Sequence, residues 1–286
     1  MTVGLLTIES ALSAATRVLA AIGIEAARAE ARLLLSHVLG LPREALLRDS
    51  RQPLERAAAR QFDRLIERRA KHEPIAYLTG RREFWSLDFE VTPATLIPRP
   101  ESETLIEAAL ARIDSPQVPH RLLDLGTGTG CLLLALLSEL PAAHGLGIDA
   151  SEAALVVARR NAHRLGLDGR ADFVHGSWGA GLEGRFDLIV ANPPYIAESD
   201  APTLAPDVVS FEPKEALFAG PDGLAAYRTL APDLARLLAP SGIAVVELGA
   251  GAAGAVAAVL AAAGLTEISR CPDLAGIVRC SLWQAR

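Results

Sequence analysis

The sequence has few cysteines and no clustered histidines. Among its 286 residues the three cysteines stand at positions 131, 271 and 280, and no pair has the C-x-x-C spacing of a zinc or redox site. The six histidines are scattered, without the arrangement of a general base or a metal centre. We therefore expect no disulfide framework and no metal site, and we interpret the cysteines as small buried apolar residues.

The sequence also lacks a long apolar run. No stretch approaches the roughly 20 uninterrupted apolar residues of a membrane helix. The first residues, MTVGLLTIESAL, carry the acidic Glu9 where a secretory signal would have basic residues. Half of the residues are hydrophobic, which suffices for a sizeable core. These features predict a folded cytoplasmic protein.

Charge is distributed unevenly along the chain. The formal net charge is −6, yet residues 1–90 hold 14 Lys+Arg against 12 Asp+Glu, and residues 43–82 hold 11 basic against 6 acidic residues. This local excess either receives an acidic partner or is a solvated helix face. The acidic balance of the remainder argues against a long duplex-binding groove, so we expect no direct nucleic-acid substrate.

The N-terminal quarter has a helical pattern. Apolar residues recur three to four positions apart over 7–72, and strong helix formers dominate, which predicts a helical domain over 1–73. The pattern then changes to alternation over 85–91, which is typical of a strand. The stretch TPATLIPRPESE, 92–103, has three prolines and predicts an ordered extended segment. We assign residues 74–100 to a connector that contains a β-hairpin.

Residues 101–286 alternate between strand and helix patterns. Strands are predicted at 121–125, 145–149, 171–175, 186–191 and 243–249, and helices at 131–140, 151–166, 223–239 and 252–263. The tail predicts two more strands joined through 272–276. Such alternation predicts an α/β fold whose mostly parallel sheet has helices on both faces.

The stretch DLGTGTG, 124–130, lies between a predicted strand and a predicted helix. In an open α/β sheet this position opens a ligand crevice, and Gly126, Gly128 and Gly130 allow a sharp turn and close approach of a ligand. A dinucleotide fingerprint reads G-x-G-x-x-G, whereas this loop reads G-x-G-x-G after Asp124.

Asp149 ends the next predicted strand, about 20 residues after the loop. An acid there can accept the ribose hydroxyls of a nucleoside. The alternative is a capping role at the following helix, which Ser151 could also fill. The loop and the acid predict a nucleoside ligand and leave both NAD and S-adenosylmethionine open. Asp124 and the glycine spacing favour S-adenosylmethionine.

The segment ANPPYIAE, 191–198, follows the buried strand that ends at Ala191. The Asn192 side-chain oxygen and the Pro193 carbonyl can each accept one N–H of an incoming NH₂ group, which holds its nitrogen toward an electrophilic methyl group. Pro193 and Pro194 stiffen the segment, and Tyr195 offers a flat face for a planar amide or base. The alternative is a turn that merely ends the strand.

The NPPY segment, the glycine loop and TPATLIPRPESE together resemble the release factor glutamine methyltransferase family. The segments HEPIAYLTGRREFW, FEPKEALFAGPDGL and DLAGIVR are also similar to that family, so the resemblance extends over nearly the whole chain. It implies a Rossmann-like, S-adenosylmethionine-dependent methyltransferase domain over 101–286, with residues 1–73 docking the substrate. The implied reaction methylates the side-chain amide nitrogen of the glutamine in the Gly-Gly-Gln loop of peptide chain release factors.

The resemblance also implies roles for individual residues. Those that would hold the cofactor are Gly126, Thr127, Gly128, Thr129, Gly130, Asp149, Trp178 and Asn192. Those that would hold the glutamine amide are Asn192, Pro193, Pro194 and Tyr195, with Asn192, Pro193 and Tyr195 acting in catalysis. Trp178 has an alternative role as a core aromatic.

One position departs from the family pattern. Many relatives carry an acid before the tryptophan, where it would meet the adenine amino group, and this chain has Ser177. A serine hydroxyl can still accept a hydrogen bond, so cofactor binding could be weaker without loss of activity. We expect Arg99, Glu101 and Glu103 to shape the pocket mouth and assign no chemistry to them.

Three other functions compete with this interpretation. NPPY also occurs in nucleic-acid adenine and cytosine amino-methyltransferases, which extrude a base into the pocket, but no extra strongly basic domain is evident here. A nicotinamide-dependent oxidoreductase would give no reason for NPPY, and the intact acceptor cluster speaks against a non-catalytic nucleoside-binding module. We expect a monomer whose partners are release factors, without a membrane partner.

Overall fold

The computed structural model describes residues 6–286. The expectation that the N-terminus is not a secretory signal concerns residues 1–12, of which the first five lie outside the described range. Internal contacts divide the chain into two units. The first comprises the chain up to Gly80 together with Ala205–Phe211, and the second comprises Arg81–Leu204 and Glu212–Arg286. The division falls within the segment 74–100 that the sequence assigns to a connector. Within residues 6–286, no helix combines the length and apolar character needed to cross a membrane.

The first unit is helical. Its helices are α1 (Ile8–Ala21), α2 (Ala27–Leu39), α3 (Arg43–Arg48), α4 (Arg56–Arg69), α5 (Ile75–Thr79) and α9 (Pro206–Phe211). Gly40 ends α2 in the left-handed conformation, with φ of 64°, which glycine adopts without strain. The core includes Leu19, Leu34 and Phe62.

The second unit contains a seven-stranded sheet in the order β5-β4-β3-β6-β7-β9-β8. Its strands are β3 (Arg121–Leu125), β4 (His144–Asp149), β5 (Ala171–His175), β6 (Phe186–Ala191), β7 (Leu238–Glu247), β8 (Leu265–Pro272) and β9 (Val278–Ala285). Strands β3 to β7 are parallel, and β9 runs antiparallel to β7 and β8. This arrangement confirms the predicted α/β fold.

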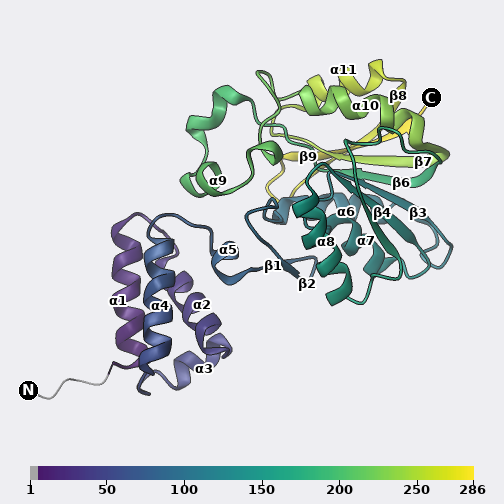
Figure 1. Cartoon of the computed structure of the whole chain (residues 1–286). Helices are drawn as coiled ribbons and strands as arrows, with labels where there is room; N and C mark the ends of the chain where they lie inside the picture. The colour runs from purple at the N-terminus through teal and green to yellow at the C-terminus, as the bar shows by residue number, and fades with distance from the viewer. Residues whose placement is uncertain (1–5) are drawn as a thin grey trace, which may run out of the picture. The chain divides into compact units, whose positions relative to one another are not determined.

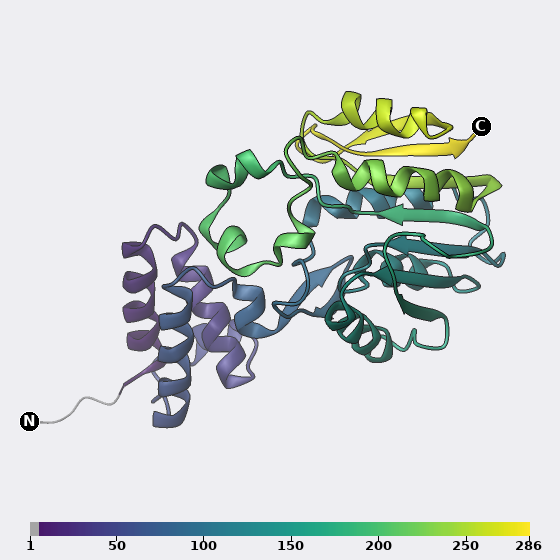
Figure 2. The same ribbon diagram turned by 45° about the horizontal axis from the view of Figure 1, so that its top comes forward.

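Alternate residues of the central strands face different helical layers. Leu122, Leu188 and Val245 belong to the core that contains residues of α6 (Glu103–Leu110), α7 (Cys131–Glu139) and α8 (Glu152–Arg164). Leu123 and Val246 belong to the core formed with α10 (Ala225–Leu237) and α11 (Ala253–Ala262). Figures 1 and 2 show these two layers on opposite faces of the sheet. Burial on both faces explains why the strands are nearly continuous apolar runs.

A two-stranded hairpin precedes the sheet in sequence. It consists of β1 (Arg81–Phe84) and β2 (Leu87–Glu90), which pair antiparallel. The prediction of a continuous strand over 85–91 is therefore wrong at its start, because Trp85 and Ser86 form the turn with φ of 53° and 58°. Glycine or asparagine usually occupies such a turn. Here the backbone N–H of Trp85 donates to Glu103 at 2.8 Å and its indole N–H donates to Glu139 at 2.8 Å, which holds the turn in place.

Short 3₁₀ helices complete the second unit: η1 (Pro100–Ser102), η2 (Glu198–Thr203) and η3 (Lys214–Ala216). The first of them follows an irregular stretch, 92–99, which includes a turn at 93–95, so the prediction of an extended segment over 92–103 holds only for its middle part.

Candidate active site

The glycine loop, Asp149 and Asn192 meet at one edge of the sheet. Strand β3 pairs with β4 on one side and with β6 on the other, and Leu125 is in register with both Ile148 and Ala191. The chain therefore leaves three neighbouring strands at the point where the strand order reverses, which is where open α/β sheets bind ligands. The strand that ends at Ala191 therefore emerges beside the glycine loop.

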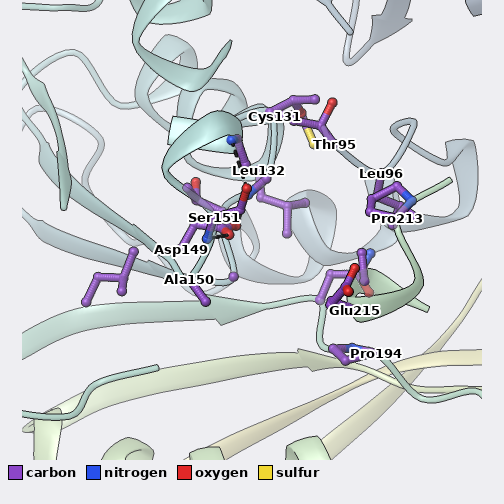
Figure 3. Close-up of a pocket in the computed structure, with 18 of the residues that line it drawn as sticks. Thr95, Leu96, Cys131, Leu132, Asp149, Ala150, Ser151, Pro194, Pro213 and Glu215 are labelled. Atoms are coloured by element: carbon purple, nitrogen blue, oxygen red, sulfur yellow. Dashed lines mark hydrogen bonds between the residues drawn. The ribbon is translucent and has the colours of Figure 1, made fainter. Parts of the chain in front are cut away.

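A cavity of about 520 Å³ lies at this edge, within the size range of small-molecule sites. Figure 3 shows Asp149, Ala150 and Ser151 on one side of it and Pro194, Pro213 and Glu215 on the other. The predicted site residues that line it are Gly126, Thr127, Gly128, Thr129, Asp149, Ser177, Trp178, Asn192 and Pro194.

The loop brings its backbone close to Trp178. A Cβ atom added to Gly126 would lie 3.5 Å from Cζ3 of the indole, and Gly126 has φ of 78°. Gly130, with φ of 81°, is enclosed further back, where an added Cβ would meet Leu134 at 3.1 Å. Trp178 is half-buried, packs against the core beneath α10 and also lines the cavity. Trp178 therefore packs against the core with one part of its ring and forms part of the cavity wall with another.

Four of the five backbone amides of the loop from Gly126 to Gly130 are engaged within the protein. The N–H groups of Gly126 and Thr127 both donate to the carbonyl of Ile148 at 2.9 Å, and Gly128 N–H donates to Asp149 Oδ2 at 2.8 Å. Gly130 N–H donates to the Thr127 carbonyl at 2.8 Å. A pyrophosphate is held in dinucleotide sites by free N–H groups of the loop and helix N-terminus. This loop therefore suits a ligand without phosphates.

Asp149 stands between the loop and α8. Its Oδ2 accepts from Gly128, its Oδ1 accepts from the Ser151 N–H at 2.8 Å, and it is only partly buried. The cap of α8 is Ser151, whose hydroxyl accepts from Ala154 N–H at 3.2 Å. Each carboxylate oxygen keeps a further lone pair, so Asp149 can accept from ligand hydroxyls in the cavity that it lines.

Two buried oxygens near the loop lack partners. Asp124 is fully buried, and its Oδ2 accepts from the Thr127 hydroxyl at 2.6 Å. Its Oδ1 and the hydroxyl of Thr129 have no hydrogen-bond partner within the part of the chain that the structure describes. Burial, and to a lesser degree the charge of Asp149, raise the pKa of Asp124 to about 7. Asp149 lines the cavity and Asp124 lies buried behind it with one oxygen unpaired. Two carboxyl groups in these positions fit a nucleoside ligand that carries positive charge.

The segment after β6 contributes two residues to the cavity wall. Asn192 and Pro194 line it, whereas Pro193 is buried and Tyr195 lies outside the lining. The Tyr195 hydroxyl donates to Glu247 Oε1 at 3.5 Å, and its ring would lie 2.9 Å from a Cβ added to Gly249. Burial and the charge of Glu247 raise the pKa of Tyr195, so it stays a neutral hydroxyl.

Ser102 and Glu247 are site residues that sequence reasoning missed. The Asn192 Nδ2 group donates to Ser102 Oγ at 3.2 Å, and Ser102 Oγ donates to Glu247 Oε2 at 2.5 Å. Glu247 is 1% exposed, and burial raises its pKa to about 7. The available signal was a lone acid at the end of an otherwise apolar strand, in IAVVELG.

Of the three residues of the connector motif, one lines the cavity. Arg99 lines it and donates to Glu212 at 2.5 Å, and the other oxygen of Glu212 accepts from Ile97 N–H at 3.1 Å. Glu101 and Glu103 are not among the lining residues, so a role for them at the pocket mouth stays a prediction. The carboxylate of Glu103 instead accepts from the hairpin turn, at the Trp85 N–H.

Solved structures with the same fold are methyltransferases. A methyltransferase from Pyrococcus furiosus is similar with a TM-score of 0.50 and 18% identity, over 76% of this chain and 96% of that chain. The hMettl16 catalytic domain is similar with a TM-score of 0.55 and 17% identity, over 80% of this chain and 82% of that chain. The second unit therefore has the Rossmann-like fold of methyltransferases.

Sequence comparison identifies the family. Residues 10–80 match the PrmC N-terminal domain, and residues 102–217 match the methyltransferase small domain. The release factor glutamine methyltransferase of Rhodospirillum rubrum is 46% identical over 92% of this chain and 81% of its own length. That of Moorella thermoacetica is 45% identical over 97% of this chain and 98% of its own length. The chain belongs to the release factor glutamine methyltransferase family.

Proposed function

We propose that this protein methylates the side-chain amide nitrogen of the glutamine in the Gly-Gly-Gln loop of peptide chain release factors. The observation that carries the proposal is Asn192 in the cavity wall, with its Nδ2 bound to Ser102, in a chain whose relatives bear that activity as their name. The chain is a methyltransferase, and its methyl donor is S-adenosylmethionine. Release factors act in translation termination, which would place the reaction in the cytoplasm.

One side of the cavity suits the cofactor. When bound, S-adenosylmethionine supplies an electrophilic methyl group on a positively charged sulfur. The loop from Gly126 to Gly130 would hold its backbone side, Asp149 would accept the ribose hydroxyls, and Trp178 would cover the nucleoside. Ser177 is exposed at the same wall and offers a hydroxyl acceptor to the adenine amino group.

The other side suits the glutamine. The nitrogen of a carboxamide is a poor nucleophile because its lone pair is delocalised, so its position must do much of the work. Asn192 Oδ1 and the Pro193 carbonyl would accept the two N–H groups, and Pro194 would close the same wall. Tyr195 lies outside the lining, where its hydroxyl bond to Glu247 holds the segment that follows Pro194. No strong base is needed, because a proton can leave after the methyl group has been transferred.

The experiment that tests this function presents three substrate classes side by side. Purified protein and labelled S-adenosylmethionine are incubated with release factor, tRNA or DNA, and labelled products are identified by mass spectrometry. We expect one added methyl group on the glutamine of the Gly-Gly-Gln loop and no label on nucleic acid. Label on an adenine or cytosine amino group instead would establish the competing amino-methyltransferase function.

We propose that the helical unit docks the release factor through α4. Arg56, Arg60 and Arg64 are exposed at intervals of four residues, so they share one helix face. Two other arginines of α4 are engaged within the unit. Arg69 is buried and pairs with Glu30 at 2.7 Å, and Arg68 pairs with Glu73. The exposed arginines of α4 are therefore available to a partner.

Reversing the charges of this face should weaken substrate binding selectively. We expect Arg56→Glu, Arg60→Glu and Arg64→Glu together to raise the KM for release factor about 10-fold, with cofactor affinity unchanged, because docking charges act on association. Arg69 is left intact, since breaking its buried pair would destabilise the unit. The matched control reverses three exposed arginines of the second unit, Arg112, Arg270 and Arg286. Equal effects of the two triple variants would remove the docking role.

A further inference from the structure

A chain of three side chains runs from the cavity wall into the core of the second unit. Asn192 Nδ2 donates to Ser102 Oγ at 3.2 Å, and Ser102 Oγ donates to Glu247 Oε2 at 2.5 Å. Ser102 and Glu247 are 2% and 1% exposed, so each depends on the other for a hydrogen-bond partner within the fold. The three residues come from the loop after β6, from η1 and from the end of β7.

The order of donors and acceptors in this chain is fixed by the charge at its inner end. An ionised carboxylate can only accept, so the single hydroxyl hydrogen of Ser102 is directed to Glu247. The Ser102 oxygen is then left as an acceptor toward Asn192, and only the NH₂ side of the carboxamide can satisfy it. The oxygen of Asn192 is therefore the end of the carboxamide that is left for a ligand in the cavity that Asn192 lines.

We propose that Glu247 and Ser102 are positioning residues that hold the Asn192 carboxamide with its oxygen toward the substrate. This inference rests on the proposed role of Asn192 as the acceptor for the glutamine amide. Without the chain, the Asn192 amide can turn over and present its NH₂ group to the cavity. Two NH₂ groups would then face each other, and the glutamine nitrogen would lose its alignment.

Protonation of Glu247 would release the same constraint. A neutral carboxyl group can donate to Ser102, whose hydroxyl is then free to donate to the oxygen of Asn192. Burial raises the pKa of Glu247 to about 7, the hydrogen bond from Ser102 opposes this, Glu101 raises the pKa further, and Arg279 and Tyr195 lower it. Around the same residue, the Tyr227 hydroxyl donates to its backbone carbonyl at 2.8 Å, and Cys280 lies opposite it on β9.

The direction of the pH effect follows from these roles. The ionised form of Glu247 is the competent one, so kcat should fall as the pH drops below about 7, the pKa of this group. Asp124 has a similarly raised pKa but lies behind the cofactor loop, so its titration should act on cofactor affinity. Measuring kcat at saturating cofactor separates the two groups.

The test compares variants of the full-length enzyme in methyl transfer to release factor. We expect Ser102→Ala to lower kcat about 10-fold or more, with the KM for release factor and the cofactor Kd within about 2-fold. Ser102→Thr keeps the hydroxyl and should restore most of the rate, because both hydrogen bonds of this oxygen can still form. Glu247→Gln should lower kcat and abolish its decline at acidic pH. Tyr227→Phe removes a buried hydroxyl that donates to the backbone carbonyl of Glu247, which leaves both side-chain hydrogen bonds of the chain in place, so it should leave kcat unchanged.

The possible outcomes separate this inference from the function on which it rests. A wild-type enzyme that labels no release factor overturns both. An active wild type in which Ser102→Ala keeps its kcat overturns the positioning role alone. Equal losses in Ser102→Ala and Ser102→Thr also overturn it, as does an acidic decline that persists in Glu247→Gln.

Discussion

Replacement of Asn192 by alanine should lower kcat for release factor methylation about 10³-fold, while the cofactor Kd changes by less than about 5-fold. Asn192 is the polar side chain of the NPPY segment in the cavity wall, and alanine would leave a glutamine N–H without its acceptor. The cofactor would keep the loop and Asp149, both on the β3 and β4 side of the cavity.

The measurement is single-turnover methyl transfer with labelled S-adenosylmethionine, together with cofactor titration by calorimetry. Thermal unfolding of the variant checks that Ser102, which loses the Nδ2 donor, has not disturbed the fold. Unchanged turnover would contradict the amide-holding role of Asn192. A parallel loss of turnover and cofactor affinity would reassign it to the cofactor alone.

The central strands could be predicted from sequence because of how they are buried. The predicted strands at 121–125, 171–175 and 186–191 have the same bounds as β3, β5 and β6. Residues on both faces of β3 and β6 pack against helices, so each strand is a short apolar run bounded by polar residues or glycine. Because the apolar run is short and its ends are marked, the bounds of the strand can be read from the sequence.

The edges of other elements could not be predicted, because tertiary contacts decide them. Trp85 and Ser86 alternate as strand residues do, but hydrogen bonds to Glu103, Glu139 and Glu83 hold them in a turn. Strand β7 begins at Leu238 and not at the predicted 243. Pro240, Ser241 and Gly242 have the composition of a turn, yet Leu238 still pairs with Phe186 across an irregularity in the register.

Site residues that belong to a continuous sequence motif could be predicted. Site residues that come together only in the folded structure could not. The glycine loop and the NPPY segment each follow a recognisable strand, so their meeting at the sheet edge could be expected. The chain from Asn192 to Glu247 joins residues that are 90 and 145 positions apart in sequence. Ser102 lies in a segment where Glu101 and Glu103 carry the more conspicuous chemistry, and only the packing of η1 against β7 singles it out.

Replacement of Asp149 by alanine should weaken cofactor binding about 10- to 100-fold. A hydrogen bond to a charged acceptor contributes about 1.5 to 3 kcal/mol, so the net loss of one such bond to a ribose hydroxyl corresponds to this factor. The variant also deprives the Gly128 and Ser151 N–H groups of their acceptor. The loss is measured by calorimetry with S-adenosylhomocysteine, and Ser151→Ala serves as the control, since it removes the cap of α8 and leaves Asp149 in place.

A second ligand separates contact with the ribose from distortion of the loop. If Asp149 binds the ribose, an analogue that lacks both ribose hydroxyls should bind the wild type and Asp149→Ala with nearly equal affinity. If Asp149 only holds Gly128, the variant should lose affinity for both ligands by the same factor. If Asp149→Ala binds the complete ligand with unchanged affinity, Asp149 does not bind the ribose. Its carboxylate would then serve only to accept from the N–H groups of Gly128 and Ser151.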